Sequence, residues 1–365
     1  MTKRDYVLLM ACILTHTVAT ASDNSNANEM LYSNLSNDEH ITMFNTHSWF
    51  DNQQQSWIVP IHGWAYEPQS SEIRKAAVSK ALKLRYGLQP TQSNQGNLTE
   101  RVNLLLADNE RNKKIVIELA GKRYALPRSA ANGHFQTTLS IPATELSSEQ
   151  STLVNFSVIL APGDTRTFTG QTTLLAEQGL SIISDIDDTI KVSNVTERKA
   201  LMQATFFDDF VAVDKMPQLY QKWHNLGAKF HFVSSSPWQL YIPLKKFLND
   251  ENFPHATMSL KSIRFKDQTL LNLFKSGTRT KPVAIRRIID SYPKRQFVLV
   301  GDSGEQDAEV YAQIAQEYPD QITKIFIRNI NQDSTLNKRY EAVFSKIDKH
   351  KWHTFESATE LFDAI

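Results

Sequence analysis

The stretch SIISDIDDTI, residues 181–190, places three carboxylates within four positions directly after a short apolar run. These acids are Asp185, Asp187 and Asp188. Like charges at this spacing repel one another, so folding alone does not explain why they are gathered. A multivalent cation bound between them would relieve the repulsion. The stretch therefore predicts a strand that ends in a metal-binding loop.

From residue 179 onward, strand patterns and helix patterns alternate along the chain. Apolar strands are expected at 179–185, 228–236, 296–304 and 322–330. Apolar residues at helical spacing are found at 213–227, 237–250, 281–293 and 305–318. This alternation is typical of an α/β fold with a Rossmann-like parallel sheet and helices on both faces. In such sheets ligands bind beyond the carboxyl ends of the strands.

Polar side chains follow three of the predicted strands. Asp185 and Asp187 follow the first, Ser234 follows the second, and Asp302 follows the third. Because parallel strands bring these ends to one edge of the sheet, we expect the side chains to converge. Asp307 lies shortly after the third strand, and Lys281 begins the helix that leads into it.

The predicted ligands are oxygens, and no Cys or His pattern accompanies them, which favours Mg²⁺ or Mn²⁺ over zinc. The DIDD string resembles the opening of an EF-hand calcium loop. The sixth position of that loop would be Ile190 instead of Gly, and the twelfth would be Thr196 instead of Glu. The EF-hand interpretation therefore fails.

The motifs resemble those of a known family. DIDDT fits the D-x-D-x-T motif of the haloacid dehalogenase-like phosphatases, and VSSSPW, a lysine before a helix and GDSGEQD are similar to the second, third and fourth motifs in order. The sequence over about 179–330 resembles most closely the catalytic domain of the Mg²⁺-dependent phosphatidate phosphatases typified by the fungal actin-patch protein. The resemblance implies a sheet of the haloacid dehalogenase type.

The resemblance implies roles for the first-motif residues. Asp185 is expected to be the nucleophile, which attacks phosphorus and forms an aspartyl-phosphate. Asp187 is expected to protonate the leaving oxygen and then to activate water. Asp188 falls at the variable position and receives no catalytic role, while Thr189 is expected to brace the loop.

The later motifs imply phosphoryl and metal contacts. Ser234 would donate a hydrogen bond to the phosphoryl group, and Lys281 would neutralise charge on the phosphoryl oxygens and on Asp185. Asp302 would hold Mg²⁺ together with Asp185 and the backbone carbonyl of Asp187, and Asp307 would orient the metal shell. Two alternatives stay open, because Ser235 and Ser236 adjoin Ser234 and because Lys275 competes with Lys281.

The spacing of the motifs bears on the substrate. Asp187 to Ser234 and Ser234 to Lys281 each span 47 residues, which leaves no clear room for a separate cap domain. An open site suits a phosphate on a large or membrane-embedded molecule. Together with the resemblance, which implies phosphatidate as the substrate, this leads us to expect a phosphatidate phosphatase that releases phosphate and diacylglycerol. The alternatives are a phosphatase of soluble or protein-bound phosphomonoesters and a non-catalytic lipid-binding module.

A basic run lies within this nearly neutral chain. The net charge of +1 gives no global field that would point to nucleic acid. Residues 261–295 nevertheless contain only Asp267 and Asp290 as acids, against Lys261, Arg264, Lys266, Lys275, Arg279, Lys281, Arg286, Arg287, Lys294 and Arg295. This run predicts either peripheral contact with an anionic membrane or an ordinary solvated face.

The N-terminal part divides into three predicted segments. Residues 1–21 resemble a secretory signal, with Lys3 and Arg4, an apolar run and an Ala-Thr-Ala cleavage pattern, and so predict a secreted or periplasmic protein that could also associate with membranes. A lipoprotein signal ending at Cys12, the only cysteine, and a frayed terminus of a cytosolic protein are the alternatives. Residues 22–40 are predicted to be a flexible leader.

Residues 41–178 are rich in aromatic and β-branched strand patterns. Two helical patterns, at 70–88 and 99–113, interrupt them. We therefore expect a β-rich, sandwich-like domain without a catalytic constellation at 41–178, followed by the phosphatase catalytic domain at 179–365.

Overall fold

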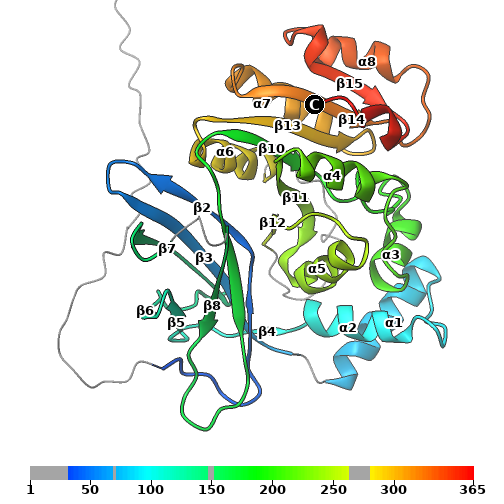
Figure 1. Ribbon diagram of the computed structural model, residues 1–365. Helices are drawn as coiled ribbons and strands as arrows, with labels where there is room; N and C mark the ends of the chain where they lie inside the picture. The colour runs from blue at the N-terminus through cyan, green and yellow to red at the C-terminus, as the bar shows by residue number, and fades with distance from the viewer. Residues whose placement is uncertain (1–31, 69–70, 147–151, 263–279) are drawn as a thin grey trace, which may run out of the picture.

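A parallel sheet of six strands forms the C-terminal half of the protein (Figure 1). The structure is a computed structural model, and it describes residues 32–68, 71–146, 152–262 and 280–365. Along the sheet the strands follow the order β12-β11-β10-β13-β14-β15. Their bounds are β10 Gly179–Ser184, β11 Lys229–Pro237, β12 Ala256–Lys261, β13 Arg295–Asp302, β14 Ile322–Arg328 and β15 Trp352–Phe355. The predicted α/β fold with a parallel sheet is confirmed.

Helices cover both faces of this sheet. Adjacent residues of a strand point to opposite faces, and apolar side chains on each face are buried beneath helices. Ile182 of β10 belongs to the core beneath α4 and α5, whereas Ile183 belongs to the core beneath α6 and α7. The helices of this half are α3 Arg198–Phe206, α4 Met216–Asn225, α5 Tyr241–Asp250, α6 Lys281–Ser291, α7 Asp307–Glu317 and α8 Leu336–Val343. Short 3₁₀ turns lie at Trp238–Leu240, Lys349–Lys351 and Ala358–Leu361.

The strand order reverses between β10 and β13. Chain progression runs outward through β11 and β12 on one side of β10, and through β14 and β15 on the far side of β13. At such a switch point the connections leave the sheet in opposite directions and open a crevice at the carboxyl ends of the two strands. Asp185 and Asp302 lie at those two ends.

The preceding part of the chain contains a nine-stranded sheet, mainly antiparallel. Its strands are β1 His40–Met43, β2 Thr46–Asp51, β3 Ser56–Glu67, β4 Asp108–Asn109, β5 Val116–Leu119, β6 Lys122–Ala125, β7 His134–Pro142, β8 Leu153–Val158 and β9 Thr169–Leu174. The long strand β3 pairs with β1, β2, β4 and β7. The predicted boundary between domains at residue 178 stays a prediction.

Two helices are inserted between β3 and β4. They are α1 Glu72–Tyr86 and α2 Gln95–Leu105. The helix predicted over 99–113 was too long, because α2 ends at Leu105 and Asp108–Asn109 pairs with Tyr66–Glu67 of β3. The buried residues of both helices, including Leu82 and Val102, join the core of the parallel sheet instead of the core of the nine-stranded sheet. In Figure 1 the two helices accordingly lie beside α3 and α5.

The two sheets contact one another through β2 and the segment before it. The Tyr292 hydroxyl donates to the carbonyl of His47 at 3.0 Å, and the backbone N–H of Asn45 donates to the Tyr241 hydroxyl at 2.9 Å. The ring of His47 packs edge-on against that of His231 in β11, with 4.6 Å between the ring centroids. Among the described residues, no helix is long and apolar enough to cross a membrane.

Candidate active site

The site begins where β10 and β13 end, at the switch point of the parallel sheet. Asp185 directly follows β10 and is 1% exposed, and Asp302 is the last residue of β13 and is fully buried. The backbone N–H of Asp185 donates to the carbonyl of Val300 at 2.9 Å, which continues the ladder between the two strands. The sheet itself therefore fixes these two carboxylates side by side.

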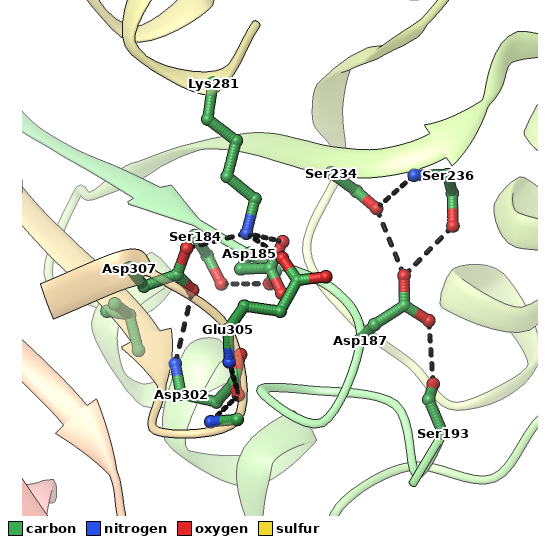
Figure 2. A network of polar contacts seen from close by, with 12 residues as sticks. Ser184, Asp185, Asp187, Ser193, Ser234, Ser236, Lys281, Asp302, Glu305 and Asp307 are labelled. Carbon is green, nitrogen blue, oxygen red and sulfur yellow. Dashed lines mark hydrogen bonds and ion pairs between the residues drawn. The ribbon is translucent and has the colours of Figure 1, made fainter. Parts of the chain in front are cut away.

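Lys281 connects three carboxylates in this site, as Figure 2 shows. Its ammonium nitrogen lies 3.0 Å from Asp185 Oδ1, 2.8 Å from Glu305 Oε2 and 2.6 Å from Asp307 Oδ1. The residue begins α6 and is only 4% exposed. Burial alone would lower the pKa of Lys281, but Asp185 and the other two acids raise it well above its ordinary value. The lysine is therefore held in its charged form.

The side-chain oxygens of Asp185, Asp302 and Asp307 form a candidate cation site, because one oxygen of each lies within 4.8 Å of the others. Burial raises the pKa of Asp185 and of Asp302 well above the ordinary range, and the neighbouring carboxylates raise both further. Lys281 alone cannot balance this charge, since Glu305 also lies in the cluster. The excess of buried negative charge favours a bound cation.

The unpaired oxygens of the cluster show which residues are available as ligands. Asp185 Oδ2 and Asp302 Oδ2 are buried and have no hydrogen-bond partner among the described residues. Both oxygens of Asp307 are engaged, one with Lys281 and the other with the backbone N–H of Asp302 at 3.3 Å. Carboxylate oxygens of this kind suit a hard divalent cation. Asp185 and Asp302 therefore fit the role of direct ligands better than Asp307 does.

The carboxylate of Asp187 points away from this cluster (Figure 2). Lys191 Nζ lies 2.9 Å from its Oδ1, and Ser193 donates to the same oxygen at 2.7 Å. Burial alone would raise the pKa of Asp187, but the Lys191 ammonium and the hydrogen bonds from Ser193 and Ser236 lower it to about 2. The Asp187 side chain therefore does not join the acidic cluster, and a metal contact through its backbone carbonyl stays a prediction.

The three serines after β11 differ in their contacts. Ser234 and Ser236 both donate to Asp187 Oδ2, at 3.2 and 2.9 Å. The Ser235 hydroxyl is buried and has no partner among the described residues, and this residue lines the pocket. Ser235 is therefore free to donate to a substrate oxygen, whereas Ser234 would first have to turn from Asp187. The alternative of Ser235 stays open.

The pocket in front of these groups has a volume of about 240 Å³. Apolar side chains, Val195 and Leu201, form part of its wall. Its other lining residues are Asp187, Ser235, Ser236, Gly304, Glu305 and Gln306. The pocket thus joins the Asp187 carboxylate to the loop that carries Glu305.

Several site residues were missed by the sequence reasoning. Lys191 and Ser193 hold Asp187, and Glu305 binds Lys281. The signal for Lys191 was its position four residues after Asp187, within the same tight loop. Glu305 lies inside the GDSGEQD motif, between two acids that were selected. Neither position is distinctive by residue type alone, since charged residues are common in surface loops.

The loop after β10 is braced by Asp188 and not by Thr189. Its Oδ1 accepts from the backbone N–H groups of Ser193 and Asn194, and its Oδ2 accepts from that of Val195. Asp188 adopts a left-handed backbone with φ of 55°, which Asp tolerates better than most residues. The Thr189 hydroxyl is buried without a hydrogen-bond partner among the described residues, so the predicted brace at Thr189 is replaced by Asp188.

The basic run at 261–295 is less continuous at the surface than predicted. Lys281 and Arg295 are 4% and 2% exposed and contribute no surface charge. Arg286 pairs with Glu317 and Lys294 pairs with Glu177. Arg264, Lys266, Lys275 and Arg279 lie outside the described residues, as does the alternative assignment of the catalytic lysine to Lys275.

Comparison with known proteins assigns the catalytic region. Residues 180–329 match the family model described as "Phosphatidate phosphatase APP1, catalytic domain". Phosphatidate phosphatase APP1 of Saccharomyces cerevisiae is 31% identical over 266 residues, which cover 69% of this chain and 44% of that protein. An uncharacterized Schizosaccharomyces pombe protein, C29B5.04c, is 34% identical over 171 residues, which cover 46% of this chain and 28% of that protein.

A solved structure, that of cytosolic 5'-nucleotidase IIIB bound to cytidine, covers 51% of this chain and 85% of its own at 12% identity. Its TM-score of 0.30 is too low to support any conclusion. The family model places residues 180–329 in a class of phosphatase catalytic domains. Residues 180–329 belong to the catalytic-domain family of the phosphatidate phosphatase APP1. The chain spans less than half the length of either curated relative.

Proposed function

We propose that this protein is a Mg²⁺-dependent phosphomonoesterase that hydrolyses a lipid phosphate such as phosphatidate. The observation that carries the proposal is the buried contact of Lys281 with Asp185 and Asp307 beside the unpaired oxygens of Asp185 and Asp302. An isolated cluster of buried acids would be costly, and these residues offer both a cation site and a charge-neutralising lysine. The family match supports phosphatidate as the substrate.

In this proposal Asp185 attacks phosphorus and the alcohol leaves, which produces an aspartyl-phosphate that water then hydrolyses. The Lys281 ammonium, 3.0 Å from Asp185 Oδ1, stabilises the negative charge that two anions bring together. Asp185 and Asp302 would hold Mg²⁺, which supplies charge neutralisation when bound. The unpaired Ser235 hydroxyl is available to donate to a phosphoryl oxygen.

Asp187 is proposed to move the proton. Its carboxylate lines the pocket and, because its pKa is lowered to about 2, it is ready to accept a proton from the attacking water. Protonation of the leaving oxygen requires the protonated form of Asp187, which would bring its proton from solvent, and the Lys191 ammonium 2.9 Å away favours return to the ionised form. The pair therefore places a cation directly behind the proposed acid–base group.

The test of the function uses purified protein and phosphatidate in detergent micelles. Phosphate release is expected with Mg²⁺ and is expected to be lost with a chelator. Release from soluble esters alone would assign a phosphatase of soluble or protein-bound phosphomonoesters. No release from any ester would assign a non-catalytic lipid-binding module.

Removal of a metal ligand is expected to weaken Mg²⁺ binding directly. In Asp302→Asn the backbone N–H groups of Gly304 and Glu305 keep an acceptor, but the unpaired carboxylate oxygen is replaced by an amide. We expect the Mg²⁺ dissociation constant to rise at least about tenfold. Titration calorimetry on metal-free protein measures this without turnover. Equal affinity in the variant and the wild type would contradict the assignment of Asp302 as a ligand.

Lys191 holds the Asp187 carboxylate in position, so its loss is expected to misplace the proposed acid–base group and to slow reactions that need a proton at the leaving oxygen. For Lys191→Met we expect a fall of about 100-fold in kcat/KM for an alkyl phosphate, within the range of acid–base catalysis. A nitrophenyl phosphate needs no such proton, so its loss is expected to be much smaller. Lys191→Arg keeps the charge and is expected to recover part of the rate. Equal losses with both esters would indicate a purely structural role.

We further propose that residues 1–21 are removed as a secretory signal, so that the protein acts outside the cytoplasm or in the periplasm. These residues lie outside the described part of the chain, and the proposal rests on their sequence alone. N-terminal mass spectrometry of the protein from its native cells tests it. A mature protein that begins at Met1 would contradict it.

A further inference from the structure

We infer that α1 is a membrane-docking helix that binds an anionic lipid surface. One face of α1 packs against the protein through Val78 and Leu82. The opposite face carries Ile73 and Leu84, which are 84% and 76% exposed. Exposed large apolar side chains are ordinary when scattered, but here both lie on one short helix. The helix therefore has a second apolar face that no described residue covers.

Helical spacing aligns this second face into a stripe. Residues separated by four, eight and eleven positions lie on one side of a helix, so Ile73, Ala77, Ala81 and Leu84 form a continuous line. All four are exposed. The two alanines keep the middle of the stripe shallow, while the large side chains project at its two ends. This shape suits insertion into the fluid boundary of a bilayer better than a fitted protein surface.

Basic side chains flank the stripe. α1 carries a single acid, Glu72, against Arg74, Lys75, Lys80, Lys83 and Arg85. Lys75 pairs with Glu72 and Arg74 pairs with Asp108, but no ion pair within the described residues involves Lys80, Lys83 or Arg85. Long basic side chains beside an apolar stripe reach lipid headgroups while the stripe enters the acyl boundary. The charge of the helix therefore favours an anionic membrane over a neutral one.

The helix is joined to the proposed active site through α2. Asn97 of α2 donates to the carbonyl of Phe207 at 2.9 Å, just beyond α3. Arg101 of α2 donates to the carbonyl of Thr205 at 2.9 Å and stacks over the ring of Phe210, with 4.0 Å from its guanidinium carbon to the ring centroid. A docked α1 would therefore hold α3, whose Leu201 lines the pocket, close to the lipid surface.

The same link reaches Asp187 itself. Lys191, which binds Asp187, lies with its ammonium 4.9 Å from the centroid of the Phe210 ring. Two more apolar residues, Val192 and Val211, adjoin this contact and are 42% and 55% exposed. The backbone N–H of Val192 donates to the carbonyl of Val211. In Figure 1 α1 forms the outer edge of the molecule, next to α2 and α3. The use of this surface in catalysis rests on the proposed function, whereas its binding to lipid does not.

Vesicle sedimentation tests the inference with full-length Asp185→Asn protein, so that no turnover occurs. The probes are phosphatidylcholine vesicles with and without about 30 mol% phosphatidylserine, a phosphodiester lipid that gives the anionic surface its charge. The expected result is binding to the anionic vesicles that weakens at high salt. Because each basic residue near such a surface contributes about fivefold, Lys80→Gln/Lys83→Gln is expected to weaken binding at least about tenfold. Ile73→Ser/Leu84→Ser is expected to do the same.

Matched controls lie elsewhere on the surface. Leu226 is 65% exposed at the end of α4, and Lys338 and Lys346 are exposed in and after α8. Helix α8 lies at the opposite end of the molecule from α1 in Figure 1. Leu226→Ser and Lys338→Gln/Lys346→Gln are expected to bind as the parent does, with unchanged thermal unfolding in all variants. Unchanged binding of the α1 variants would overturn the inference. Absence of binding to any vesicle would also overturn it, in favour of an acidic protein partner, whatever phosphatidate hydrolysis shows.

Discussion

Asp185→Asn is expected to reduce phosphate release from phosphatidate by at least about 10⁴-fold. When catalytic residues act together, removing the nucleophile alone abolishes nearly all of their combined rate enhancement. The amide is a far weaker nucleophile than the carboxylate, and it also removes one negative charge from the proposed cation site. Asp185 is 1% exposed and its Oδ1 contacts Lys281, so the substitution alters the site at its centre. Single-turnover phosphate release measures the loss.

An aspartate on the surface provides the control for this result. Asp214 lies on the surface before α4, and Asp214→Asn is expected to keep the full rate. A phosphorylated enzyme should be trapped from the parent protein by acid quench and should be missing from Asp185→Asn. The residual rate of Asp185→Asn should therefore be far below about 1% of that of the parent protein. If this variant kept more than about 1% of the rate, another group would have to attack phosphorus.

The acidic cluster could be predicted from the sequence because it depends on topology. Asp185 and Asp302 each follow a recognisable apolar strand, and the strands are neighbours in a parallel sheet. Their carboxyl ends then meet without any knowledge of side-chain packing. Lys281 was found for a related reason, since it begins the helix that leads into β13. Strand ends and helix starts are features that the order of the chain determines.

The groups around Asp187 could not be predicted in the same way. Lys191 reaches Asp187 only because the loop turns sharply at Asp188, whose left-handed backbone is held by the N–H groups of Ser193 and its neighbours. The residue type at position 188 does not predict this turn, because a left-handed backbone is uncommon for Asp. The same limit applies to the burial of Arg295, which counted as a surface charge in the sequence but binds backbone carbonyls beneath β10.

The contact of the two sheets was also beyond sequence reasoning, and it has a consequence for stability. His47 and His231 are 4% and 2% exposed, and their atoms Nδ1 and Nε2, respectively, have no hydrogen-bond partner among the described residues. Burial, assisted by the charge of Arg295, lowers the pKa of His231 to about 3. Burial likewise lowers the pKa of His47 well below its ordinary value, assisted by His231, His255 and Arg295.

Acid is therefore expected to weaken the fold in a pH range above most carboxylate titrations. A histidine whose pKa is lower in the folded state binds fewer protons there than when unfolded, so the stability is complete above about pH 6.5 and falls as the pH drops toward 3. By pH 5 His231 alone costs about 2 kcal/mol of unfolding free energy, and His47 adds a cost of the same sign. Urea unfolding at pH 7.5, 6 and 5 measures this loss.

The pH slope, and not the absolute stability, identifies the histidine responsible. His231→Gln loses packing and the contact with Thr257, so it is expected to be less stable than the parent at pH 7.5. Between pH 6 and 5 its unfolding free energy should nevertheless fall less steeply, by about one proton, or 1.4 kcal/mol per pH unit. Buried carboxylates with raised pKa values, such as Asp185, act in the opposite direction but cancel in the difference. His350→Gln, at an exposed position, should leave the pH slope of the unfolding free energy unchanged. Equal slopes for His231→Gln and the parent would show that His231 does not cause the loss of stability in acid.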